Sequence, residues 1–395
     1  MQKVVDAYNS EQGVQDKVNV EMVLLSRTDT FSKEATMMAA KSSEVDVYFT
    51  TSYILGQHVQ ALDPLEFVPE DKYFETAIEG LQYEGAQYAV PLDVGSHGLI
   101  YRTDLIEGML ADADTYGAVS ENVLGQRMAP KHPDEWNWDD FLAAGAYFTK
   151  QYNPEASTTH GTVMQAKNLL FNVMLWNDVL WSYGGSWTDD SGAPAIDSEA
   201  GRSAVEVYRS AYEKGIAAPS SAQAEFPEAQ AGMTAGSVAF IPQWTVGFSQ
   251  LNDPATSPET AGKIALAPMP GENHRTHVHA LAIGLNKHSE NKDAATTWMT
   301  YLTTPGAMKA YAEAGGLPSY PSALEELKDT NPLFGFTLED LPNHGYTPPI
   351  EKGTYSTLVK LAQSLSGAWV GEGSVDDALR DADQAVADTL TSGDK

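Results

Sequence analysis

The sequence predicts an α/β protein built from two lobes. Its 395 residues exceed what one typical hydrophobic core organises, and 42% of them are hydrophobic, which is a globular proportion. Between residues 2 and 49 the pattern alternates helix, strand, helix and strand, the rhythm of a parallel sheet covered by helices. No repeat and no low-complexity linker interrupts the chain, so we expect short crossovers between the lobes.

The N-terminal elements follow from periodicity and from residues that favour strands. Residues 2–10 and 30–43 place apolar side chains at helical spacing. "VNVEMVLL" (18–25) alternates and then runs apolar, and "VDVYF" (45–49) is rich in β-forming residues, so both predict strands. The second strand is expected to stop at the polar loop "TTSY" (50–53), and ligands of such sheets gather beyond the carboxyl ends of strands.

Later segments carry helix end signals. "NWDDFLAAGAYFTK" (137–150) begins with Asn137 as an N-cap and Asp140 three residues later. Further helices are expected at 198–215, closed by Gly215, at 289–316 with a break near Pro305, and at 374–390, capped by Ser374 with Asp377. Two short strands are expected around Pro91 and Asp93 within 87–105.

The stretch "AGMTAGSVAFIPQWTVG" (231–247) raises a specific question. Residues 237–241 predict a buried strand that Pro242 ends, which places Gln243 and Trp244 on the loop beyond it. A large apolar side chain directly after a strand is either part of the core or a flat platform for a ligand.

The charge and cysteine content exclude several function classes. Net charge is −30, from 54 acidic and 24 basic residues, and phosphate contacts need clustered Lys and Arg, so we expect no nucleic acid and no anionic membrane surface as partner. The acids are spread along the chain, which is typical of a solvated acidic surface, the alternative being a site that attracts cations. The absence of cysteine excludes disulfides, thiol catalysis and Cys-based zinc sites. No apolar run of about 18 residues and no signal-peptide pattern occurs in this chain.

A series of segments, in order along nearly the whole chain, resembles the carbohydrate-binding group of extracytoplasmic solute-binding proteins of ABC importers, the maltose-binding-protein-like family. "YAVPLDVGSHGLIYRTDL" and "AQAGMTAGSVAFIPQWTVG" are two of these segments. The matching ranges are 45–68, 88–105, 133–150, 183–216, 229–247, 279–320 and 374–386. The resemblance implies a two-lobed periplasmic-binding-protein type II fold, in which each lobe is a mixed sheet flanked by helices and the ligand lies in a cleft between the lobes.

The resemblance also implies lobe boundaries. We expect an N-terminal lobe of 1–107 plus 264–310, lacking the family's first strand, and a C-terminal lobe of 108–263 plus 311–395. Hinges are expected near 105–110, 258–265 and 308–317. The sequence departs from the family at Thr50, where the family has a tryptophan, and at Gly232, where the usual lysine after the glycine is replaced by methionine.

Sugar recognition needs aromatic faces for the C–H face of a pyranose, and carboxylates and amides for its hydroxyl groups. Such groups follow strands or flank helices at matching positions of the chain. The predicted ligand-binding residues are Thr50, Tyr53, Asp93, Asn177, Trp181, Tyr183, Gln243, Trp244, His277 and Tyr355. A place in the core remains an equal alternative for Thr50, Tyr53 and Trp181, whereas Trp176, Trp298 and Tyr301 are expected in the core.

Metal binding and catalysis are less well supported. "HRTHVHA" (274–280) puts His277 and His279 on one strand face, which could bind zinc or copper, but no acidic or Cys partner follows at ligand spacing. We therefore expect no metal, no cofactor, and a histidine that reaches the ligand. No Ser-His-Asp elbow, P-loop or GxGxxG motif occurs, so we expect no enzyme.

The resemblance implies the solute-binding component of an ABC importer. Such a component captures a mono- to oligosaccharide or a polyol, closes about its hinges, and delivers the ligand to the membrane permease. We expect a monomer outside the cytoplasm, either periplasmic or a cell-surface lipoprotein. Two alternatives stay open: a cationic solute such as a polyamine or betaine in an aromatic cage, and a carbohydrate-processing enzyme with paired carboxylates.

Overall fold

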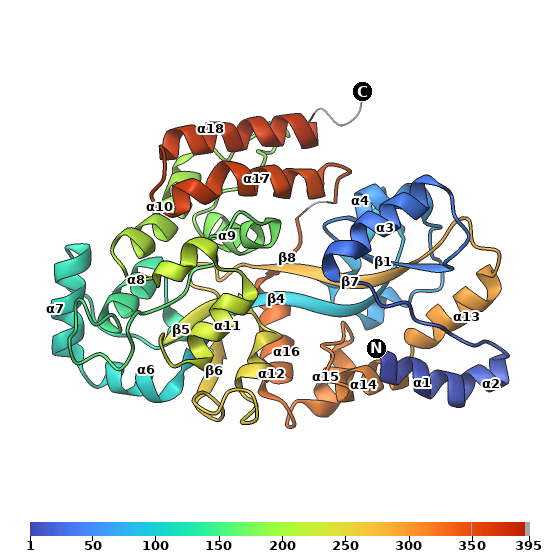
Figure 1. Ribbon diagram of the computed structural model, residues 1–395, viewed down its shortest axis with the longest axis horizontal. Helices are drawn as coiled ribbons and strands as arrows, with labels where there is room; N and C mark the ends of the chain where they lie inside the picture. Colours follow the sequence, from blue (N-terminus) through green and yellow to red (C-terminus); the bar gives the residue numbers. More distant parts are fainter. Residues whose placement is uncertain (349, 392–395) are drawn as a thin grey trace. The chain divides into compact units, whose positions relative to one another are not determined.

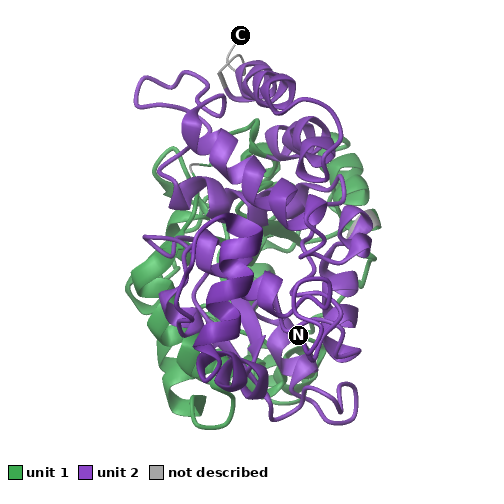
Figure 2. Ribbon diagram, turned by 90° about the vertical axis from the view of Figure 1, so that its left-hand side faces the viewer, with its two compact units in different colours: residues 1–95, 278–354 green, residues 96–277, 355–395 purple. Residues whose placement is uncertain are grey.

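The computed structural model describes residues 1–348 and 350–391, and the chain divides into two compact units. Unit 1 comprises residues 1–95 and 278–354, and unit 2 comprises residues 96–277 and 355–395 (Figure 2). The chain passes between the units within strand β4 (Val90–Arg102), within strand β7 (Thr276–Leu285), and at the start of helix α17 (Thr354–Trp369).

These unit boundaries differ from the lobe boundaries expected at 107, 264 and 310. Two of the passages lie inside long strands, where no change in composition marks them. The third differs because residues 311–354 belong to unit 1, where Ala312, Tyr320 and Ala323 are buried.

Unit 1 is built on strand β1 (Val47–Thr51), which pairs antiparallel with β7 so that Val47 lies opposite Leu285 and Thr51 opposite Leu281. Tyr8 of the first helix contacts Trp298 edge-on in its core. Its helices are α1 (Gln2–Ser10), α2 (Gln12–Asp16), α3 (Arg27–Ala39), α4 (Leu55–His58), α5 (Glu75–Glu79), α13 (Lys292–Leu302), α14 (Pro305–Glu313), α15 (Pro321–Leu327) and α16 (Pro332–His344), and its short strands are β2 (Gln82–Tyr83), β3 (Ala86–Gln87) and β8 (Gly345–Tyr346) (Figure 1).

The strand expected at 18–25 does not form, and that prediction was wrong. Asn9 takes the place of a strand partner: its side chain donates to the carbonyl of Val20 and accepts from the Val20 N–H, both at 2.8 Å. Val18, Val20 and Met22 still pack against the core of unit 1. The alternation of apolar residues therefore reflects the burial of one side of this segment and not hydrogen bonding to a neighbouring strand. The pairs β1–β7, β4–β5 and β4–β6 are antiparallel, so the parallel rhythm expected from residues 2–49 is not realised in these pairs.

Unit 2 is built on β4, which pairs antiparallel with β5 (Phe240–Trp244) and β6 (Ile264–Ala267). Helix α10 packs against both α9 and α18 (Figure 1). The helices of this unit are α6 (Thr103–Leu110), α7 (Ala113–Leu124), α8 (Trp138–Tyr147), α9 (Leu170–Ser182), α10 (Glu199–Glu213), α11 (Phe226–Thr234), α12 (Gly247–Leu251), α17 and α18 (Val375–Val386). Among the described residues, no helix is long and apolar enough to cross a bilayer.

The expected helix ends are confirmed. Asn137 and Asp140 form a reciprocal capping box at the start of α8. Ser198 caps α10, and Gly215 follows that helix with a positive φ of 68°. Thr304 caps α14, which starts at Pro305 as expected.

Two strand predictions were wrong. Strand β4 is continuous from Val90 to Arg102, whereas two short pieces were expected. Strand β5 continues through Pro242 to Trp244, whereas the sequence predicted that Pro242 would end it. Within the described chain β5 pairs with β4 alone, and a proline without an N–H is tolerated on such an edge strand. Thr50 likewise lies inside β1 and not in the loop after it.

Candidate functional site

Three of the predicted site residues come together in unit 2, and with His97 they form what we call the aromatic cluster: Trp181, Trp244, His277 and His97. The rings of Trp181, on α9, and His277, on β7, stack with centroids 5.8 Å apart and planes 11° apart. Trp244, the last residue of β5, meets His277 edge-on at 6.4 Å. The exposed fractions of Trp181, Trp244 and His277 are only 4%, 8% and 2%, so most of each ring surface contacts protein.

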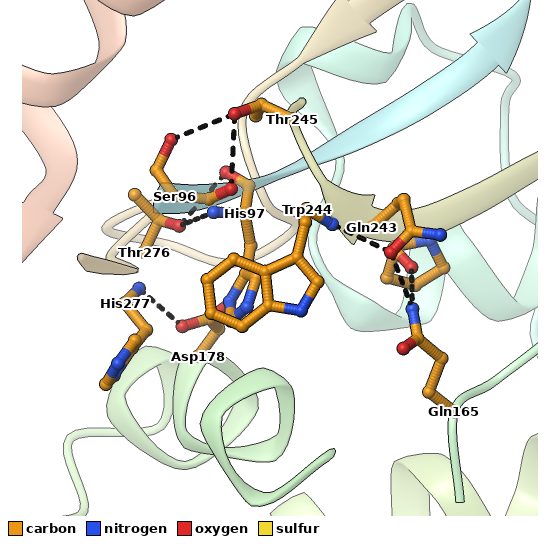
Figure 3. A network of polar contacts seen from close by, with 10 residues as sticks. Ser96, His97, Gln165, Asp178, Gln243, Trp244, Thr245, Thr276 and His277 are labelled. Atoms are coloured by element: carbon orange, nitrogen blue, oxygen red, sulfur yellow. Dashed lines mark hydrogen bonds and ion pairs between the residues drawn. The ribbon is translucent and has the colours of Figure 1, made fainter. Parts of the chain in front are cut away.

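A buried carboxylate supports the aromatic cluster from below (Figure 3). Oδ2 of Asp178 lies 2.7 Å from Nδ1 of His97, and its Oδ1 accepts the backbone N–H of His277 at 2.7 Å. Because an ionised carboxylate only accepts, Nδ1 of His97 carries the hydrogen of this contact. The ring of His97 in turn meets Trp244 at 4.0 Å between centroids.

Backbone contacts fix the strands at this point. The hydroxyl of Thr276 accepts the N–H of His97 at 3.1 Å and donates to its carbonyl at 3.0 Å. Thr245 donates its N–H to the carbonyl of Ser96 at 2.9 Å. Its hydroxyl donates to the same carbonyl at 3.2 Å (Figure 3). Thr276, which precedes His277, and Thr245, which follows Trp244, are therefore both bonded to β4.

Gln243 lies beside Trp244, and its carboxamide is bonded to protein groups (Figure 3). Its Oε1 accepts the N–H of Trp244 at 2.9 Å and Nε2 of Gln165 at 2.9 Å, and its own Nε2 donates to the carbonyl of Phe226 at 3.1 Å. The side chain is fully buried, so the structure places it where it orients Trp244.

Among the buried polar atoms that lack a hydrogen-bond partner within residues 1–348 and 350–391, one belongs to His97 of the cluster and another lies one helical turn before Trp181 on α9. These two atoms are Nε2 of His97 and Nδ2 of Asn177. Asn177 precedes Asp178 on α9, and its Oδ1 accepts Nε1 of Trp187 at 2.9 Å. Because buried polar groups are normally paired, these two atoms mark positions where a polar ligand or water fits.

In unit 1 the predicted residues Thr50 and Tyr53 are buried. Oγ1 of Thr50 lies 3.1 Å from Nδ1 of His58, whose pKa burial lowers to about 4. The ring of Tyr53 meets that of His279 edge-on, with centroids 5.6 Å apart. Both side chains thus contact other residues in the interior of unit 1, as expected if they belong to its core, which was the alternative to ligand binding.

Asp93 is also buried in unit 1. Its Oδ2 accepts the hydroxyl of Tyr311 at 2.9 Å and the N–H of Leu317 at 2.8 Å. Burial raises the pKa of this carboxyl to about 6, against the lowering effect of those two bonds.

The other two predicted residues lie at helix ends of unit 2. Tyr183 directly follows α9 and is 41% exposed, and Tyr355 is half-buried in the first turn of α17. Unit 1 holds Thr50, Tyr53 and Asp93, whereas the other predicted residues belong to unit 2: Asn177, Trp181, Tyr183, Gln243, Trp244, His277 and Tyr355.

Sequence reasoning missed His97, Asp178 and Gln165. Asp178 carried one usable signal, because a carboxylate inside the apolar run "LLFNVMLWNDVLW" needs a buried partner. Its partner His97 lies 81 positions away, and nothing in the local pattern identifies it. Among the residues that the structure describes, no group of three or more His, Asp or Glu side chains could hold a metal ion.

Comparison with known proteins identifies the family. Residues 3–333 match the family model of bacterial extracellular solute-binding proteins. A probable amino-acid ABC transporter periplasmic-binding protein of Sinorhizobium fredii is 29% identical over 191 residues, which are 48% of this chain and 41% of that relative, so the match spans less than half of its length. A mannitol-binding protein of Pseudomonas aeruginosa is 23% identical over 353 residues, covering 82% of this chain and 75% of that protein.

Among solved structures, maltose-bound MalE3 of T. maritima has a TM-score of 0.80 at 20% identity, with 98% of this chain and 96% of that chain covered. This likeness shows the two-lobed α/β fold that the sequence predicted. Together with the family match over most of its length, it establishes that the chain belongs to the bacterial extracellular solute-binding proteins.

Proposed function

We propose that this chain is the solute-binding component of an ABC importer and that it binds a sugar or polyol at the aromatic cluster of unit 2. Membership of the family, the likeness to a mannitol-binding protein and the likeness to a maltose-bound structure support the ligand class. The observation that carries the proposal is the pairing of aromatic rings with buried polar atoms that have no protein partner, at His97 Nε2 and Asn177 Nδ2.

The chemistry of the cluster suits a polyhydroxylated ligand. Indole faces at Trp181 and Trp244 can pack against C–H groups, and Nδ2 of Asn177 can donate to a hydroxyl oxygen. With Nδ1 of His97 donating to Asp178, Nε2 can accept from a ligand hydroxyl in the neutral tautomer and donate to a hydroxyl oxygen in the imidazolium form. Each unpartnered atom then gains a bond on binding, which favours a ligand rich in hydroxyl groups over an apolar one.

A cationic solute is less favoured at this site. Asp178 is the carboxylate that supports the cluster, and both its oxygens already accept N–H groups, from His97 and from His277. A polyamine or betaine would therefore find aromatic faces there but no carboxylate oxygen to contact directly, because Asp178 is fully buried with both oxygens bonded. The same argument weighs against glycoside hydrolysis, which uses two carboxylates at the scissile bond. We infer that the ligand is bound and released unchanged.

The remaining parts of the proposal follow from the family and the charge. We propose that the protein acts outside the cytoplasm as a monomer, that its partners are the importer's membrane subunits, and that it needs no cofactor. A net charge of −30 argues against nucleic acid as a partner. Light scattering of the purified protein tests the monomer, since a dimer would double the 42.7 kDa mass.

Native mass spectrometry of the purified protein, followed by calorimetry, tests the ligand class. The titration panel contains monosaccharides, oligosaccharides, polyols, polyamines, betaine and amino acids, the last because of the Sinorhizobium relative. We expect a bound hexose, oligosaccharide or polyol and saturable binding of the same compound. Binding of polyamines or amino acids alone would replace the proposal. Conversion of an oligosaccharide during prolonged incubation would show an enzyme.

A further inference from the structure

We propose that Asp178 is a positioning residue for ligand binding, because it sets the orientation of the aromatic cluster without touching the ligand. The affinity test of this inference rests on the proposed function, whereas the test by fluorine spectroscopy does not. Asp178 is fully buried near the end of α9, so no part of its side chain is available to a ligand. Its influence must therefore pass through the groups that it contacts.

Those groups come from two strands. Oδ2 holds the ring of His97 on β4, and Oδ1 holds the backbone of His277 on β7, each at 2.7 Å (Figure 3). One carboxylate thus ties a helix to two strands inside unit 2. Charge-assisted bonds of this length restrict rotation of the imidazole and the local path of the backbone.

The two histidines carry this restriction to the tryptophans. His97 contacts Trp244 at 4.0 Å between centroids, with planes 65° apart, and His277 stacks on Trp181 at 5.8 Å. The rings of His97 and His277 lie 5.9 Å apart at 25°. Loss of the carboxylate would free the ring of His97 and the backbone of His277 together, so both indoles would lose one fixed neighbour.

Asp178→Asn is the main test variant. It keeps the size of the side chain and an oxygen that can accept from His277, but it presents an amide N–H₂ to Nδ1 of His97. Asp140→Asn is the matched control, because Asp140 is equally buried in the same unit and accepts Nζ of Lys131 at 2.8 Å, at the start of α8. Both variants lose a buried charge, and only one of them touches the cluster.

The first readout needs no ligand. The protein contains eight tryptophans, and 5-fluorotryptophan labelling gives each a ¹⁹F resonance, with those of Trp181 and Trp244 assigned from W181F and W244F. Because asparagine keeps the bond to His277, we expect Asp178→Asn to shift or broaden the Trp244 resonance more than that of Trp181, while that of Trp298 in unit 1 stays in place and Asp140→Asn leaves all three unchanged. An unchanged Trp244 resonance in Asp178→Asn would overturn the proposal, whatever the ligand is.

The second readout is a double-mutant cycle in affinity for a compound that the wild-type protein binds. Asp178→Asn should weaken binding about tenfold or more, and the loss should largely disappear in a Trp244→Ala background, because the two residues act through one contact chain. An additive loss, or an equal loss in Asp140→Asn, would assign Asp178 a merely structural role. If the wild type binds nothing in the panel, the proposed function fails, and the fluorine spectra still decide on positioning.

A second variant covers the case in which Asp178→Asn does not fold. In His97→Asn the amide nitrogen takes the place of Nδ1, so the bond to Asp178 is kept while the ring that contacts Trp244 is removed. We expect this variant to fold and to move the Trp244 resonance more than that of Trp181. A folded His97→Asn with an unchanged Trp244 resonance would overturn the proposed route from Asp178 to Trp244.

Discussion

His97 and Asp178 form a fully buried pair, with Nδ1 and Oδ2 2.7 Å apart, that joins strand β4 to helix α9. Breaking a buried pair leaves an uncompensated charge and typically lowers the free energy of unfolding by about 3–5 kcal/mol. The ring of His97 meets that of Trp244 with centroids 4.0 Å apart, and its Nε2 is one of the two unpartnered polar atoms. The contacts that stabilise this part of unit 2 are therefore also those that orient its aromatic rings.

Trp244→Ala is expected to weaken ligand binding about tenfold or more, because it removes an aromatic face from the proposed site. It should also lower the free energy of unfolding by about 3–5 kcal/mol, because the side chain of Trp244 is only 8% exposed. Calorimetric titration and urea unfolding measure the two effects. Trp298→Ala is the control: this core residue of unit 1 is 7% exposed, and its loss should reduce stability alone. Equal affinity losses in both variants would contradict a platform role for Trp244.

Asn177→Ala should reduce affinity by removing a donor that has no protein partner, and it should also leave Nε1 of Trp187 without its acceptor. We expect a Kd about tenfold higher, in line with the loss of one buried hydrogen bond. Asn286→Ala in unit 1 is the control, because Asn286 is equally buried, its Nδ2 donates to the carbonyls of Ser42 and Val45, and its Oδ1 accepts the N–H of His288. A Kd unchanged by Asn177→Ala would move the ligand away from α9.

Glu34→Gln is expected to change how stability depends on pH. Burial raises the pKa of Glu34 to about 7 from 4.5, even though its Oε1 accepts the N–H of Phe49 at 2.9 Å. The folded state thus holds this proton more tightly than the unfolded state, so Glu34 makes the free energy of unfolding fall as pH rises from about 4.5 to about 7. Glutamine removes that fall, which is on the order of 3 kcal/mol.

The measurement is the difference in unfolding free energy between Glu34→Gln and wild type, taken from pH 4 to 8 by urea unfolding. We expect it to increase in favour of the variant across the window from about 4.5 to 7. Asp93, with a pKa raised to about 6, and His58, with a pKa lowered to about 4, titrate in both proteins and cancel in this difference. Glu79→Gln, at an exposed position of unit 1, is the control. A flat difference would show that Glu34 titrates as in the unfolded chain.

Salt should stabilise the protein. A net charge of −30 produces repulsion between surface carboxylates, and the Debye length falls from about 30 Å at 0.01 M to about 8 Å at 0.15 M salt. Each kcal/mol of relieved repulsion should raise the Tm by roughly 2–4 °C for a unit of this size. Thermal unfolding in increasing NaCl tests this, with sucrose as a non-ionic control. A Tm that falls with NaCl would mean that attractive ion pairs outweigh the repulsion.

Predictions of helix ends were correct where they depended on interactions between residues close in sequence. The capping box of Asn137 and Asp140, the Ser198 cap and the Pro305 start depend on side chains that reach backbone groups within three residues, so the sequence is sufficient. The family and its fold followed from the order of segments. Trp244 and Trp181 were predicted from that resemblance and from the need of a sugar site for aromatic faces, and their contact with the binding partner stays a prediction.

Long-range pairing could not be read in this way. Residues 18–25 have the alternation of a strand, yet whether a strand forms depends on a neighbouring strand, and here Asn9 occupies the Val20 backbone instead. Pro242 signals a strand end, yet an edge position opposite Leu99 tolerates it.

The sequence by itself determined the fold family, most helix ends, the net charge of −30 and the aromatic residues from which a sugar site would be built. Only the tertiary structure decided that the carboxamide of Gln243 accepts the backbone N–H of Trp244 and that Thr50 contacts His58. It also decided that Asp178 joins His97 and His277. The physical reason is range. Caps and periodicity act over a few residues, whereas a buried carboxylate is satisfied by whichever donors the folded chain brings to it, here from positions 81 and 99 residues away.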